Sequence, residues 1–101
     1  LAFAGFVRQY PRSGYVPSAR FWLGNAQYAA RDYKEAIGNF KMMLSESPGH
    51  ARAPEAALSI ANCQIELKET RTARKTLEDL LRAYPQSEAA VAAKERLSRL
   101  K

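Results

Sequence analysis

The chain has 101 residues, which is enough for one domain with a modest core, and its abundant alanine, leucine, lysine, arginine and glutamate favour helix. Sixteen basic and ten acidic residues give a net charge of +6, but they are spread too evenly to predict a nucleic-acid-binding stripe. No stretch reaches the roughly 18 to 20 apolar residues that a membrane span requires, so we expect a soluble protein without a direct membrane span.

The first segment, residues 1–11, reads as the middle of a helical unit and predicts a helix over 2–9. It carries neither an initiator methionine nor a leader, so we expect a piece or processed form of a longer protein, with any leader or anchor outside this sequence. In such a unit, the apolar residues Phe3, Phe6 and Val7 would pack against a preceding helix. We therefore predict that this face can pair with a second copy, giving a homo-oligomer.

Three prolines, Pro11, Pro48 and Pro85, lie 37 residues apart, and the same shift superimposes Ala36 on Ala73. A period between 20 and 50 residues is typical of stacked supersecondary units. The chain is therefore predicted to be a single repeat domain with four parts. These are the second helix of a truncated repeat (1–11), two full repeats (12–48 and 49–85) and a C-terminal helix (86–101).

In the first full repeat, apolar residues recur every three or four positions and predict helices over 16–30 and 33–46. Asp32 and Glu35 have the spacing of a capping box, so Asp32 is predicted to cap the second of these helices. Pro17 fits the first turn of its helix, where the missing N–H costs nothing.

The second repeat predicts helices over 53–68 and 70–83, and the remainder predicts one over 87–100. Ser13 and Ser87 each follow a repeat proline by two residues and can help to start the next helix. Pro54 corresponds to Pro17 of the first repeat.

Small residues recur at Gly24, Ala61 and Ser98, where the two helices of a hairpin would cross closely. The predicted fold is thus all-α, a solenoid of helical hairpins with about six antiparallel helices. Because neighbouring hairpins must stack to bury their apolar faces, we expect a right-handed superhelix with a concave face.

This pattern resembles the tetratricopeptide repeat. The first repeat matches the family's Leu-Gly, Tyr, Ala, Phe and Pro positions with Leu23, Gly24, Tyr33, Ala36, Phe40 and Pro48. The second matches with Ile60, Ala61, Ala73, Leu77 and Pro85, and has Thr70 in place of the tyrosine. Arg20 and Ala57 occupy the place of the family's tryptophan, and the repeat is longer than the usual length of about 34 residues.

A narrower resemblance covers nearly the whole chain. The segments "FVRQYPRSGYVPSARFWLGNAQYAARDYKEAIGNF" and "HARAPEAALSIANCQIELKETRTARKTLEDLLRAYPQSEAAVAAKERL" resemble the C-terminal repeat domain of the Tol-Pal system periplasmic protein, the cell division coordinator family of Gram-negative bacteria. The shared features are YP-x-S, a [YF]-W-L-G tetrad and an A-x-x-A-K-E-R-L ending. The middle "SPGH" departs from YP-x-S.

The resemblance implies a periplasmic scaffold that binds the inner-membrane Tol protein spanning the periplasm and a bifunctional peptidoglycan synthase. Through both, such proteins coordinate septal wall synthesis with outer-membrane constriction. Family members also carry a signal peptide and an N-terminal coiled coil that trimerises, and neither is in this chain. The related outer-membrane assembly lipoproteins, which also use YP-x-S helical repeats, are the alternative family.

Two further alternatives stay open. One is an oligomerisation module whose concave face is filled by its own chain. The other is a cytosolic peptide-binding adaptor, which would need basic clamp residues beside Asn25 and Asn62, where Phe21 and Leu58 stand instead.

No enzymatic function, cofactor or metal site is predicted. His50 is the only histidine and Cys63 the only cysteine, so no metal-ligand set exists, and no nucleophile motif or phosphate-binding glycine loop is present. Cys63 lies among apolar and small residues, which favours a buried thiol.

The first helix of each repeat is predicted to line the concave face and bind protein. The predicted residues are Ser18, Phe21, Asn25, Tyr28, Ala29, Glu55, Leu58, Asn62, Ile65 and Glu66, with Glu95 and Arg99 extending the row. Asn25 and Asn62 lie one repeat apart, and each amide offers a donor and an acceptor to a peptide backbone. The alternative is that both are exposed polar residues without a binding role.

Aromatic residues anchor many interfaces, so Phe21 and Tyr28 favour binding at this face. Two interpretations of Trp22 remain open, packing against the preceding hairpin or anchoring a partner. Arg20 and Arg52 are predicted to lie on a solvated face rather than to steer an acidic partner.

Overall fold

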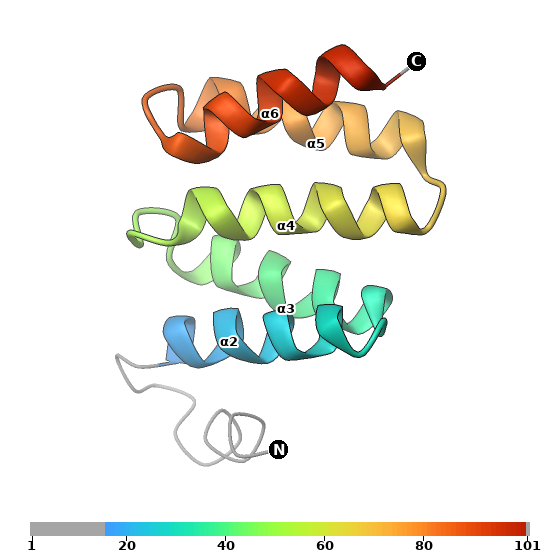
Figure 1. Ribbon diagram of the computed structural model, residues 1–101. Coiled ribbons are helices and arrows are strands. Elements are labelled where there is room, and N and C mark those ends of the chain that lie inside the picture. Colours follow the sequence, from blue (N-terminus) through green and yellow to red (C-terminus); the bar gives the residue numbers. More distant parts are fainter. Residues whose placement is uncertain (1–15, 101) are drawn as a thin grey trace.

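The computed structural model describes residues 16–100, which form five α-helices. The helices are α2 (Val16–Ala29), α3 (Tyr33–Glu46), α4 (Ala53–Glu66), α5 (Thr70–Ala83) and α6 (Glu88–Arg99). Successive helices are antiparallel and lie in two layers, with α2, α4 and α6 in one and α3 and α5 in the other (Figure 1). The predicted all-α fold of stacked helical hairpins is confirmed. The helix predicted over 2–9, with Phe3, Phe6 and Val7, and also Ser13, lie outside the described residues.

The helices predicted over 33–46 and 70–83 have those bounds in the structure, whereas the first helix of each repeat ends one or two residues earlier than predicted. The chain turns after these helices because Arg31 and Lys68 adopt left-handed backbone conformations, with φ of 67° and 65°. This conformation commonly ends a helix, although glycine is its usual occupant. Arg31 and Lys68 are one repeat apart, so the repeat includes the turn as well as the apolar residues.

The same hydrogen bond closes both turns. The Asp32 N–H donates to the Gln27 carbonyl, and the Glu69 N–H donates to the Gln64 carbonyl, each at 2.8 Å. A bond of this span is part of the Schellman motif, which satisfies a carbonyl that the helix end would leave unpaired.

The capping predictions had different outcomes. Asp32 occupies the N-cap position of α3, but within residues 16–100 its carboxylate makes no capping hydrogen bond, so that prediction is wrong. Its ψ of 67° lies outside the extended region in which capping residues usually sit. Ser87 has an extended backbone with ψ of 158°, and its Oγ accepts from the Ala90 N–H at 3.0 Å. Pro17 and Pro54 lie in the first turns of α2 and α4, as predicted.

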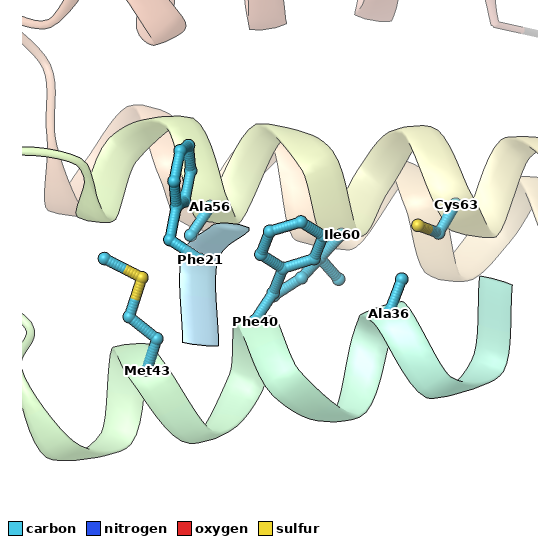
Figure 2. Close-up of a cluster of buried hydrophobic side chains, with 7 residues drawn as sticks. All are labelled: Phe21, Ala36, Phe40, Met43, Ala56, Ile60 and Cys63. Atoms are coloured by element: carbon cyan, nitrogen blue, oxygen red, sulfur yellow. The ribbon is translucent and has the colours of Figure 1, made fainter. Parts of the chain in front are cut away.

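Helix α4 lies at the centre of the core because it packs on both sides. Its Ala56, Ile60 and Cys63 join a first cluster of buried side chains with α2 and α3 (Figure 2). Its Ala57 and Ala61 join a second cluster with α5 and α6. The other members of the first cluster are Phe21, Ala36, Phe40 and Met43, and those of the second are Leu77, Leu80, Ala89, Ala90 and Ala93.

Close helix crossing is confirmed at Gly24, where a Cβ atom would lie 2.8 Å from Cε1 and Cζ of Phe40. Ala61 is also fully buried, in the second cluster. Ser98 is exposed, so the prediction fails there. The reason is that no helix within residues 16–100 follows α6 to pack over it.

Two glycine substitutions should change stability in opposite directions. Gly24→Ala should lower the free energy of unfolding by about 1–3 kcal/mol, because the added methyl group overlaps the buried Phe40 ring. Gly38→Ala should raise it by about 0.5–1 kcal/mol, because Gly38 is an exposed position in α3 with nothing within 4 Å of the added Cβ. Urea unfolding followed by circular dichroism measures both. Stabilisation by Gly24→Ala would contradict the close crossing of α2 and α3.

Candidate functional site

The layer of α2, α4 and α6 presents a row of side chains that we call the first-helix face. On α2 the row is Ser18, Trp22, Asn25 and Ala29, and one repeat later on α4 it is Glu55, Ser59, Asn62 and Glu66. This spacing of four, three and four residues keeps each set on one side of its helix. All eight residues are partly or fully exposed. The positions on this face therefore recur from one repeat to the next, but the residue types at most of them differ.

A hollow of about 350 Å³ lies at one end of the first-helix face. It is lined by Tyr28, Asn62, Ile65, Glu66, Arg96, Arg99 and Leu100, so α2, α4 and α6 all contribute. Five of the predicted residues, including Arg99, thus lie together, and Arg96 joins them. We call this the Asn62 hollow.

Asn62 is held in place from the neighbouring repeat. The Arg96 guanidinium donates from Nε to Oδ1 of Asn62 at 2.8 Å. This bond uses one of the two lone pairs of the amide oxygen, and the two amide N–H groups can donate to a partner. Sequence reasoning missed Arg96, because no motif indicates that two residues 34 positions apart will meet.

Tyr28 adds a second donor to the Asn62 hollow. Its ring packs edge-on against Tyr33, with centroids 5.5 Å apart. Burial raises the pKa of the Tyr28 hydroxyl above its usual value, and the nearby Glu66 carboxylate raises it further. The phenol therefore stays protonated at neutral pH and can donate a hydrogen bond.

Glu55 and Leu58 lie at the other end of the face, in a separate hollow between the N-terminal ends of α4 and α6. This second hollow is lined by Ala51, Pro54, Glu55, Leu58, Ser87, Glu88, Ala89 and Ala92. Farther along α6, Arg99 pairs with Glu95 at 3.0 Å on the surface. The row predicted from the sequence thus contributes to two separate hollows, and Ser18, Asn25 and Ala29 line neither of them.

Phe21 does not belong to the exposed face. Its side chain is only 2 % exposed and packs edge-on against Phe40, with centroids 6.0 Å apart. The prediction that Phe21 faces a partner is wrong, because the side chain points into the seam between α2 and α4. Apolar spacing identifies the buried side of a helix but not how far it extends toward the next hairpin.

Trp22 is 42 % exposed within the described part of the chain. The Arg52 guanidinium lies over its indole ring at 5.1 Å and over the Phe21 ring at 5.4 Å. Such cation–π contacts hold a guanidinium in a fixed position. Arg52 is exposed, as predicted, and it also pairs with Glu55 at 3.5 Å.

Arg20 is buried, in contrast to the solvated position predicted for it. It is 9 % exposed, and its Nε donates to Oε1 of Glu46 at 2.9 Å, tying α2 to the end of α3. A buried arginine needs such a partner because an unpaired charge is costly away from water. Arg20 thus takes the place of the family's tryptophan by means of an ion pair.

Both hairpins also share a polar cross-link that sequence reasoning missed. The Gln27 Oε1 accepts from Nδ2 of Asn39, and the Gln64 Oε1 accepts from Oγ1 of Thr76, each at 2.7 Å. Gln64 is 3 % exposed, and burial of its amide is tolerated because it is hydrogen-bonded. The 37-residue spacing of both partners could have indicated this contact.

A further hollow lies on the opposite layer between α3 and α5, with α4 beneath it. It is lined by Lys41, Leu44, Ala57, Ile60, Thr76, Asp79, Leu80, Ala83 and Tyr84. None of the predicted binding residues lines it. This hollow combines the apolar Leu44, Ile60 and Leu80 with the charged Lys41 and Asp79, so its lining differs from that of the Asn62 hollow.

The described residues contain no group of three or more histidine, cysteine or acidic side chains that could hold a metal ion. No helix within residues 16–100 combines the length and the apolar character needed to cross a membrane. Cys63 is fully buried, as predicted, and burial raises the pKa of its thiol to about 11.

The raised pKa of Cys63 predicts a loss of stability at alkaline pH. The folded state holds the thiol proton more tightly than the unfolded state, whose reference pKa is 9.0. The stabilisation that comes from the protonated thiol is fully present below pH 9 and is lost as the pH rises toward 11. When the pH is raised from 8 to 10, the free energy of unfolding should fall by about 1 kcal/mol more in the native protein than in Cys63→Ala. Urea unfolding at the two pH values measures this difference. Equal losses in both proteins would contradict a buried, protonated thiol.

Comparison with known families identifies the repeat. A tetratricopeptide repeat family model matches residues 18–97, which cover both hairpins and most of α6. A search of curated proteins finds no match to the chain. Tetratricopeptide repeats are in general non-catalytic modules that bind other proteins. The chain therefore belongs to the tetratricopeptide repeat family and is a scaffold for protein–protein interaction.

Proposed function

We propose that this domain is a periplasmic scaffold of the Tol-Pal system that holds protein partners through its first-helix face. Membership of the tetratricopeptide repeat family supports the scaffold role. The YP-x-S, FWLG and AAKERL segments support the narrower assignment by resemblance. The observation that carries the binding site is the Asn62 hollow, to which three successive first helices contribute. A surface shared among repeats suits an elongated partner.

The proposed partners are the inner-membrane Tol protein that spans the periplasm and a bifunctional peptidoglycan synthase. By holding both, the domain would link septal wall synthesis to constriction of the outer membrane. Its role requires no bond making or breaking. The Asn62 hollow instead offers N–H donors from Asn62 and the arginines Arg96 and Arg99, the Tyr28 hydroxyl, and the Glu66 carboxylate as an acceptor.

A second candidate function is the recognition of a peptide carboxylate. The basic clamp that this function needs is absent from the positions flanking Asn62 on α4, but Arg96 and Arg99 of α6 bring two guanidinium groups to the same hollow. Guanidinium groups bind carboxylates through paired hydrogen bonds. A partner whose carboxyl terminus is blocked would then bind more weakly.

Binding should depend on the Asn62 hollow. With the periplasmic helical part of the Tol inner-membrane protein as partner, Asn62→Ala should weaken binding by about 1–2 kcal/mol, or roughly 5- to 30-fold in Kd, because it removes the amide donors at the centre of the hollow. Titration of the domain followed by nuclear magnetic resonance (NMR) measures both the Kd and the residues affected. Glu78→Ala, an exposed position on α5, is the matched control and should bind as the native protein does.

The location of the chemical-shift changes provides the decisive reading. Changes concentrated on Tyr28, Asn62 and Ile65 would support the proposed face. Changes confined to α3 and α5, with full binding by Asn62→Ala, would move the site to the opposite layer. No change at about millimolar partner would count against the Tol-Pal assignment.

A further inference from the structure

His50, the only histidine of the chain, links the turn between α3 and α4 to the first turn of α2. Its Nδ1 accepts a hydrogen bond from the Arg52 backbone N–H at 3.0 Å, and its Nε2 lies 3.1 Å from Oγ of Ser18. A backbone N–H can only donate, so Nδ1 must be unprotonated and the ring proton must lie on Nε2. The observed geometry therefore belongs to the neutral imidazole.

The residue that His50 holds is the one that contacts the exposed tryptophan. Arg52 is the N-cap of α4, so the bond to His50 fixes its backbone at the start of that helix. Its guanidinium lies over the Trp22 ring at 5.1 Å. A continuous set of contacts thus runs from His50 through Arg52 to Trp22 on the first-helix face.

Protonation of His50 is incompatible with one of these contacts. A charged imidazole carries hydrogen atoms on both nitrogens, so Nδ1–H would oppose the Arg52 N–H, and that hydrogen bond would be lost. The bond from Nε2–H to Ser18 could remain. Protonation would also place a positive charge two residues from the Arg52 guanidinium, which repels it.

Within residues 16–100, charged and titratable groups lie near this turn on each of the helices around it. The groups are Arg20 on α2, Glu46 on α3, Arg52 and Glu55 at the start of α4, Tyr84 after α5, and Glu88 on α6. The Tyr84 hydroxyl donates to the Pro48 carbonyl, and Glu88 lines the second hollow together with Ala51. Histidine is the side-chain type whose charge ordinarily changes between about pH 5 and 8. Cys63, with a pKa of about 11, does not titrate in this range.

We propose that His50 is a pH-sensitive switch. Its protonation breaks the hydrogen bond to the Arg52 N–H and moves the Arg52 side chain relative to Trp22. Acidification would then alter the first-helix face next to the second hollow, where Arg52 also pairs with Glu55. The consequence for partner binding rests on the proposed function. The coupling of His50 to Trp22 does not, because it is a property of the domain alone.

The single tryptophan makes the coupling measurable. Tryptophan emission of the full chain is recorded from pH 8 to pH 5, with far-ultraviolet circular dichroism to verify that the helices persist. The native protein should show a one-proton transition in Trp22 emission. The imidazole resonances of His50 in NMR spectra should titrate with the same midpoint.

Two variants distinguish the effect of His50 protonation from a general effect of acid on Trp22 emission. In His50→Asn the amide oxygen can accept from the N–H two residues ahead at every pH, so emission should stay at the neutral value of the native protein. In His50→Phe no acceptor is present, so the Arg52 N–H is released at every pH and emission should show no transition between pH 8 and pH 5. A flat emission in the native protein while His50 titrates, or a transition retained in His50→Asn, would overturn the proposal. Because no partner enters the experiment, that failure would leave the proposed function intact.

Discussion

The packing of α4 on both of its sides is the constraint on which the rest of the molecule depends. A single hairpin cannot bury both its apolar faces, so each repeat must complete its core with the next one. Ile60 closes the first cluster against Phe40, and Ala61 closes the second. Phe40 is fully buried at the crossing with Gly24, and truncation of such a ring typically costs about 3–5 kcal/mol. The first-helix face is the outer surface of this shared core.

Polar contacts then fix the helices within that frame. The Gln27–Asn39 hydrogen bond of the first hairpin has its counterpart in the Gln64–Thr76 bond of the second. The Arg20–Glu46 ion pair belongs to the first repeat, where Arg20 stands at the position of the family's tryptophan. The bond from Arg96 to Asn62 lies in the first-helix face itself, because it ties α6 to α4 across the Asn62 hollow. A binding residue held by its neighbour loses less side-chain freedom when a partner arrives, which favours affinity.

The sequence predicted the helices well because the evidence for them is local and repeated. Apolar spacing gave the bounds of α3 and α5, and the shift of 37 residues located the close crossing at Gly24. The turn conformations of Arg31 and Lys68 escaped prediction, because glycine is the usual residue there. Local patterns therefore determine where each helix lies, and the turns adjust to the packing.

The site was predicted less completely, because its details depend on contacts between repeats. Asn62 and Tyr28 lie on the predicted face, but Phe21 is buried in a seam that no single-helix pattern reveals. Arg52 reaches Trp22 from a different repeat. Such contacts depend on how far one hairpin rotates against the next, and helical periodicity carries no information about that angle.

We infer that α4 joins both clusters into one cooperative unit, so that the first-helix face is held as a single surface. Urea unfolding followed in the same samples by Trp22 emission and by far-ultraviolet circular dichroism shows whether α2 unfolds together with the other helices. Trp22 reports on α2, whereas the dichroism reports on all helices. We expect the two transitions to share one midpoint and one slope. Loss of the Trp22 signal at a distinctly lower urea concentration would contradict it, because α2 would then open independently of α4, α5 and α6.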